Sequence, residues 1–65
     1  MRNLEELKQD FFTDRNELIE ELEINDYEVL DAAEESIIVG YEDEDGYEFE
    51  VDLTIIEAGS TLKIQ

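Results

Sequence analysis

The chain has no cysteine, no histidine and no proline, and only three glycines among its 65 residues. The missing cysteines exclude a disulfide framework and a cysteine-based metal site. The missing histidines remove the usual general base and the commonest ligand of transition metals. A domain of this size also offers little room for a substrate cleft. We therefore expect a protein that is not an enzyme and that holds no metal or cofactor.

Basic residues are scarce as well. Between Asn16 and Leu62 there are seventeen Asp and Glu residues and no Lys or Arg, and the net charge of the chain is −17. A surface without cations cannot neutralise itself through ion pairs, so its field attracts basic surfaces and opposes compaction. Because this excess of negative charge opposes folding, its retention suggests that the charge is used, and it predicts a basic partner. The four basic residues lie outside this stretch: Arg2, Lys8, Arg15 and Lys63.

Long hydrophobic runs are absent, so no segment has the length of a transmembrane helix. The charged N-terminal segment also lacks an apolar stretch before a small-residue cleavage site. The hydrophobic content of 42% is nevertheless high enough for a core, although 65 residues are near the lower limit for an unassisted one. We expect a single cytoplasmic domain over residues 1–65, without membrane contact.

Apolar residues in the first third of the chain recur at helical spacing: Leu4, Leu7, Phe11, Leu18 and Leu22. Steps of three, four and seven residues place them on one face of a helix. This pattern predicts an amphipathic helix from about Asn3 to Glu23, ending at Asn25-Asp26. Two segments have the spacing of an N-terminal cap with a reciprocal carboxylate, Asn3 with Glu6 and Asp14 with Glu17. The second cap leaves open whether the helix is one long element, kinked near Thr13, or two short ones.

The rest of the chain alternates between apolar and polar residues, which indicates strands. The clearest strand is Tyr47–Leu53, and Ile37–Glu42 precedes it, with a turn at Asp45-Gly46 between them. Two further strands are expected, Tyr27–Ala32 and Thr61–Ile64. A helix packed across three or four antiparallel strands makes a two-layer α+β fold.

The register of the central hairpin follows from its side chains. A two-residue turn at Asp45-Gly46 would set Phe49 opposite Glu42 and bring charge into the buried face. A three-residue loop, with Gly46 in the left-handed conformation, avoids this. That loop pairs apolar residues throughout, which predicts the pairs Tyr41 with Phe49, Val39 with Val51, and Ile37 with Leu53.

The same register predicts an acidic ladder on the other face. Glu48, Glu50 and Asp52 would stand about 6.6 to 6.8 Å apart along the strand, with Glu42 opposite Glu48. Like charges across a strand pair are destabilising, so a use for them is expected. The candidate partner-binding residues are Glu42, Asp43, Glu44, Asp45, Glu48, Glu50 and Asp52, with Glu17, Glu20 and Glu21 on the helix as a second patch.

In size, acidity and α+β pattern the chain is similar to the small acidic DNA-mimic inhibitors of bacteriophages, which include some anti-restriction and anti-CRISPR proteins. The similarity implies an inhibitor that occupies the nucleic-acid-binding surface of a basic protein, such as a nuclease, repressor or polymerase, in the host cytoplasm. It rests on no shared motif, so no residue role is carried over. Direct nucleic-acid binding is not expected, because the field repels phosphate.

Four alternatives stay open. The chain could neutralise one basic toxin, as antitoxins and immunity proteins do, or it could be an assembly protein whose charge serves solubility. The apolar residues Phe12 and Ile19 could broaden the core or form a homodimer patch, a question that outward-facing Ile38 and Ile56 also raise. A calcium loop is a weaker alternative, because Asp43, Asp45 and Gly46 fit its third, fifth and sixth positions but Tyr41 occupies the first.

Overall fold

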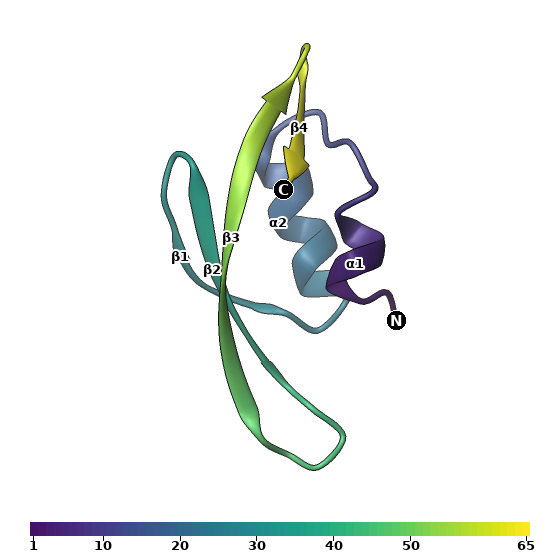
Figure 1. Cartoon of the computed structure of the whole chain (residues 1–65), viewed down its shortest axis with the longest axis vertical. Coiled ribbons are helices and arrows are strands. Elements are labelled where there is room, and N and C mark those ends of the chain that lie inside the picture. The colour runs from purple at the N-terminus through teal and green to yellow at the C-terminus, as the bar shows by residue number, and fades with distance from the viewer.

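The computed structural model describes all of residues 1–65 and places two short helices against a four-stranded antiparallel sheet (Figure 1). Each strand lies beside its predecessor, in the order β1-β2-β3-β4. The predicted α+β class and antiparallel sheet are therefore confirmed. The elements are α1 (Leu4–Leu7), α2 (Arg15–Ile24), β1 (Glu28–Ala32), β2 (Ser36–Glu42), β3 (Glu48–Ala58) and β4 (Thr61–Ile64).

A single long helix from Asn3 to Glu23 is wrong, and the alternative of two short helices is correct, because the chain divides there into α1 and α2. The connecting segment crosses to the far edge of the sheet, where Phe12 pairs with Leu62. The Phe12 N–H donates to the Leu62 oxygen at 2.8 Å, and the Leu62 N–H donates back at 2.7 Å. Phe12 itself is 3% exposed and packs in the core. A continuous helix would forfeit both the edge pairing and this burial.

The predicted N-terminal caps at Asn3 and Asp14 both form and set where the helices begin. The reciprocal carboxylate bonds do not form, since Glu17 accepts the N–H of Thr13 and not that of Asp14. The Asn3 side chain accepts the Glu6 N–H at 2.9 Å, and the Asp14 side chain accepts the Glu17 N–H at 2.9 Å. Each bond satisfies one of the four N–H groups that a helix start leaves unpaired. The second helix stops at the predicted place, because Asn25 is its C-terminal cap and Asp26 has a φ of 64°.

The predicted register of β2 and β3 is confirmed at every pair. Tyr41 faces Phe49, Val39 faces Val51, and Ile37 faces Leu53. Gly46 has a φ of 85°, as the three-residue loop requires. The Asp43 carboxylate accepts the N–H groups of Asp45 and Tyr47, each at 2.9 Å, and so holds the loop closed.

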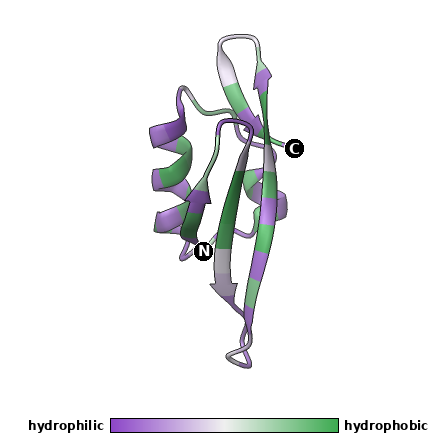
Figure 2. Cartoon of the chain, turned by 90° about the vertical axis from the view of Figure 1, so that its left-hand side faces the viewer, coloured by the Kyte–Doolittle hydropathy of each residue, from purple (hydrophilic) through white to green (hydrophobic).

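The core lies between the helices and one face of the sheet. Its side chains come from both helices, from three strands and from the segment between α1 and α2, and Ile19 packs against them. Phe12 is thus a core residue, and Ile19 is half-buried against the core. Along β3, the long strand at the right of Figure 2, hydrophobic and hydrophilic residues alternate, so one of its faces is apolar and the other polar. The buried core residues are Leu7, Phe12, Leu18, Leu22, Ile37, Val39, Leu53, Ile55 and Ile64.

Neither helix has the length and apolar content needed to cross a bilayer.

Candidate protein-binding surface

The face of the sheet opposite the helices is uncovered, and its acidic residues come from three strands. Strand β3 contributes Glu48, Glu50 and Asp52, all exposed, and β2 contributes Glu42. Strand β1 adds two acids that the sequence did not single out, Glu28 and Asp31. We call the set Glu28, Asp31, Glu42, Glu48, Glu50 and Asp52 the acidic face.

Strand pairing fixes how these carboxylates are arranged. Glu42 lies directly opposite Glu48, with no residue between them. Gly40 lies between Glu28 and Glu50, and it carries no side chain to separate them. The Leu30 side chain covers Gly40, and a Cβ there would lie 3.3 Å from Leu30 Cδ1. The missing side chain at Gly40 therefore leaves room for the Leu30 side chain between the acidic residues.

A β-bulge explains why β1 supplies two acids to one face. Leu30 is the extra residue between the pairs of Val29 with Val39 and Asp31 with Ile38. Strict alternation would have turned Asp31 toward the core, whereas a bulge shifts the residues beyond it by one place. Because sequence alternation does not mark a bulge, Asp31 could not have been assigned to this face from the pattern alone.

None of the four basic side chains neutralises the acidic face. The ion pairs of the chain join Arg2 to Asp10 and Glu21, and Lys8 to Glu5. The remaining two cations are also engaged away from it. Arg15 donates to the carbonyl of Ala33 in the β1–β2 loop, and Lys63 lies 5.1 Å from the centre of the Phe11 ring.

The three loop acids differ in role. Glu44 and Asp45 are exposed at the hairpin tip with no side-chain hydrogen bond, whereas Asp43 is half-buried and holds the loop through its two accepted N–H groups. Asp43 therefore has a structural role whether or not it meets a partner.

The second predicted patch lies on the other layer of the fold and is not continuous with the acidic face. Glu20 is exposed on α2, whose Leu18 and Leu22 are buried in the core. Glu17 accepts the Thr13 N–H at 3.2 Å and so belongs to the helix start. A flat partner could not contact α2 and the uncovered sheet face together.

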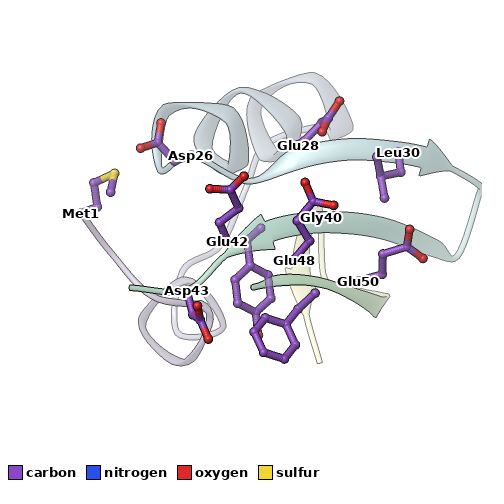
Figure 3. Close-up of a pocket in the computed structure, with 11 residues that line it drawn as sticks. Met1, Asp26, Glu28, Leu30, Gly40, Glu42, Asp43, Glu48 and Glu50 are labelled. Carbon is purple, nitrogen blue, oxygen red and sulfur yellow. The ribbon is translucent and has the colours of Figure 1, made fainter. Parts of the chain in front are cut away.

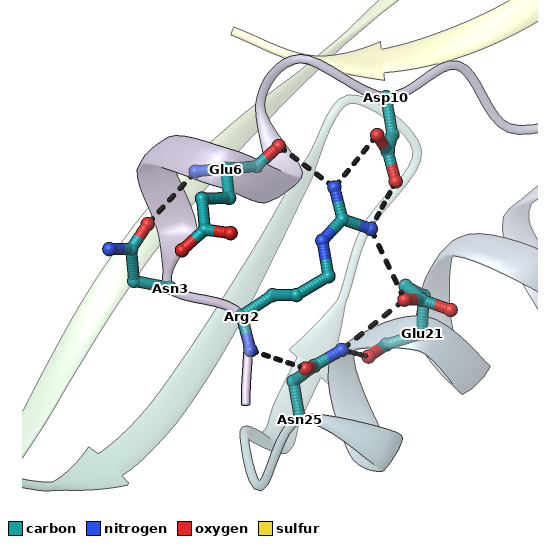
Figure 4. Close-up of polar contacts among 6 residues, drawn as sticks. All are labelled: Arg2, Asn3, Glu6, Asp10, Glu21 and Asn25. Carbon is teal, nitrogen blue, oxygen red and sulfur yellow. Dashed lines mark hydrogen bonds and ion pairs between the residues drawn. The ribbon is translucent and has the colours of Figure 1, made fainter.

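Glu21 is part of a polar cluster between the helices, shown in Figure 4. The Arg2 guanidinium donates to both carboxylate oxygens of Asp10, to Glu21 at 3.4 Å and to the carbonyl of Glu6 at 3.2 Å. The buried Asn25 side chain accepts the Arg2 N–H at 2.8 Å and donates to the Glu21 carbonyl, also at 2.8 Å. The cluster ties the N-terminal segment to both helices.

The charges in this cluster shift each other's pKa. The hydrogen bond from Arg2 lowers the pKa of Asp10, against the opposing effect of desolvation. The same hydrogen bond raises the pKa of Arg2, with further contributions from the nearby charges of Asp10 and Glu21. No sequence pattern marks this cluster, because Arg2 and its partners are separated along the chain.

A shallow, open hollow of about 760 Å³ lies where the hairpin extends past the start of β1 (Figure 3). Its labelled carboxylates come from the turn before β1, from β1 itself, from both hairpin strands and from the hairpin loop, and no Lys or Arg side chain lines it. The acidic lining residues are Asp26, Glu28, Glu42, Asp43, Glu48 and Glu50.

Aromatic rings support the hairpin on the other face. Tyr41 stacks on Phe49 with ring centres 5.4 Å apart, and Tyr27 meets Tyr41 edge to face at 5.6 Å. Desolvation by burial raises the pKa of the Tyr27 hydroxyl, and the neighbouring Tyr41 adds to the shift. Phe49 remains 43% exposed and Tyr47 68% exposed, so this end of the hairpin extends beyond the helical layer.

No three acidic side chains converge in an arrangement that could hold a metal ion. The Asp43 carboxylate instead accepts backbone N–H groups, as expected for a residue that closes a hairpin turn.

Comparisons with protein-family models, with curated proteins and with solved structures found no match to this chain.

Proposed function

We propose that this chain is a protein inhibitor that binds the nucleic-acid-binding surface of a basic protein by imitating a nucleic acid. The observation that carries the proposal is the acidic face, in which three adjacent strands present carboxylates without a compensating cation. A surface that needs only to be solvated would be served as well by mixed charges, which do not repel across strands.

The mechanism is steric and electrostatic competition. Duplex DNA presents closely spaced negative charge, and proteins that bind it offer matching Lys and Arg residues. Carboxylates on a hydrogen-bonded sheet are held at fixed spacing, about 6.6 to 6.8 Å along β3. Charge complementarity would steer the encounter and suppress wrong partners, and the binding would weaken as salt rises.

The proposal is tested by capturing partners of the tagged chain from a bacterial lysate at physiological salt, with and without excess duplex DNA. We expect one nucleic-acid-binding protein to be retained and to be displaced by the DNA. A single basic protein that DNA does not displace would favour neutralisation of a toxin instead. Retention of nothing basic beyond a scrambled acidic control would contradict both functions.

Charge reversal assigns the binding to the acidic face. Replacing Glu48, Glu50 and Asp52 by Lys should leave the fold intact and abolish capture. A matched variant reverses three exposed acids elsewhere, Glu23, Glu34 and Glu57, and should retain the partner. If the first variant binds normally, or if both lose binding equally, the acidic face is not the site.

A further inference from the structure

The N-terminal half of β3 has an unpaired edge. Strand β3 pairs with β2 from Glu48 to Thr54, but it pairs with β4 only from Ile55 to Ala58. Strand β4 therefore stops halfway along β3. In Figure 1 the lower part of β3 has β2 on one side and no element on the other.

The hydrogen bonds at the junction show which backbone groups face this edge. The Ile55 N–H donates to the Glu35 carbonyl on the β2 side at 2.8 Å, whereas the Thr54 carbonyl accepts from Gln65 on the β4 side at 2.8 Å. Backbone groups of alternate residues point to opposite edges of a strand. The N–H and C=O groups of Glu48, Glu50 and Asp52 therefore point to the unpaired edge.

We infer that this edge accepts an extended segment of a partner protein, antiparallel to β3 and in line with β4, in which Lys or Arg alternates with apolar residues. Added strands gain affinity from main-chain hydrogen bonds and specificity from alternate side chains. The inference rests on the proposed function for the charge of the partner, and it adds a binding mode that a DNA-like face does not require.

Cross-strand neighbours determine the composition of the added segment. Residues opposite Glu48, Glu50 and Asp52 would share their face, where Lys or Arg forms favourable pairs. The residues between them would lie beside Phe49 and Val51, on the face where Phe49 is still 43% exposed. Apolar side chains there would remove this surface from water.

The same acids argue against a second copy of this chain as the occupant. If the edges of two β3 strands paired in antiparallel fashion about Glu50, each Glu50 would face its counterpart and Glu48 would face Asp52. Like charges directly opposite are destabilising. Charge on an unpaired edge also protects proteins from pairing with themselves.

Amide hydrogen exchange of the full chain tests the inference, with a capped Lys-Val-Lys-Val-Lys-Val peptide as the probe. At free peptide of about 100 times Kd, exchange at Glu48, Glu50 and Asp52 should slow by about 100-fold. The control is the same peptide with a methyl group on the backbone nitrogen of each of its three lysines. This peptide keeps every side-chain charge but lacks the backbone N–H groups that face β3. Equal protection by both peptides, or no protection at these three amides, would overturn strand addition.

Two variants at one position provide a second measurement. Glu50→Pro removes an N–H that faces the unpaired edge, where proline is tolerated in sheets, while Glu50→Gln removes the same charge and keeps the N–H. We expect the Gln variant to bind the peptide weakly and the Pro variant not to bind it. Equal affinity of the two variants would contradict strand addition. If the Pro variant captured the lysate partner and the triple lysine variant did not, strand addition would be overturned and the proposed function would still stand.

Discussion

Glu42 and Glu48 lie directly opposite each other on neighbouring strands, and neither forms an ion pair. They occupy a non-hydrogen-bonded position, because the flanking pair of Asp43 and Tyr47 is bonded, with an N–H to O distance of 3.0 Å. Such positions bring opposed Cα atoms to about 4.5 Å, the closer of the two spacings in an antiparallel ladder. The fold therefore tolerates repulsion at the strand pair next to the loop of its protruding hairpin.

Relieving this repulsion should stabilise the protein. Glu48→Lys replaces a like-charged pair by an opposite-charged one, and we expect the free energy of unfolding to rise by about 0.5 kcal/mol. Urea unfolding at low ionic strength measures the change. Glu44→Lys is the control, because it alters the net charge equally from a loop position without a cross-strand partner. An equal gain in both variants would show that net charge matters and the Glu42–Glu48 pair does not.

The two adjacent isoleucines of β2 should respond differently to the loss of one methyl group. Ile37 is completely buried, whereas Ile38 points to the uncovered face and is half-buried. Ile37→Val should lower the free energy of unfolding by about 1 kcal/mol, and Ile38→Val by less than half as much. Urea unfolding of both variants compares them directly. The opposite order would mean that the strand has slipped by one residue, since such a slip exchanges its faces.

The central hairpin was predictable because its constraints are local. The alternation of Tyr47–Leu53, together with one glycine able to adopt positive φ, leaves a single register with an apolar face. The helix prediction failed because its competitor is distant in sequence. The helical spacing placed Phe11 on the buried face, but Phe11 is exposed and Phe12 is buried instead, and the edge pairing of Phe12 with Leu62 depends on where β4 lies.

The candidate site was also predictable only where its residues are set by local constraints. The acids of β2 and β3 were placed by the hairpin register, whereas Asp31 depends on a bulge that alternation does not reveal. Glu21 has the spacing of an exposed helical residue, yet Arg2 and Asn25 hold it between the helices. The hydrogen bonds from Arg2 to Glu21 and Asn25 join residues 19 and 23 positions apart, and no periodic pattern encodes them.

The Arg2 cluster predicts a dependence of stability on acid. Because the pKa of Asp10 is lower in the folded chain than its ordinary value, the bond to Arg2 stabilises the fold above about pH 4. This stabilisation is lost as the pH falls through the lowered pKa of the folded state. Arg2→Met should therefore reduce stability at pH 7, and the difference from the native chain should shrink below pH 4. Thermal unfolding across that range measures the convergence.

Lys8→Met is the matched control for this prediction. It removes the same charge from an exposed pair with Glu5, whose N–O distance is 3.5 Å. Exposed pairs of this kind contribute at most about 0.5 kcal/mol, so the variant should differ little from the native chain at either pH. A loss at pH 7 equal to that of Arg2→Met would assign the effect to net charge and not to the cluster.

The hairpin loop should depend on the conformational freedom of Gly46. Its φ is 85°, and a Cβ at this position would have no atom within 4 Å. Any effect of Gly46→Ala is therefore backbone strain alone, and we expect a loss of about 1 to 2 kcal/mol in the free energy of unfolding. Gly46→Asn should lose less, because asparagine enters the left-handed region more readily than alanine. Urea unfolding of the two variants checks this order. An alanine variant as stable as the native chain would mean that the loop adopts another type of turn. In that turn the Asp43 carboxylate would no longer accept the N–H groups of Asp45 and Tyr47.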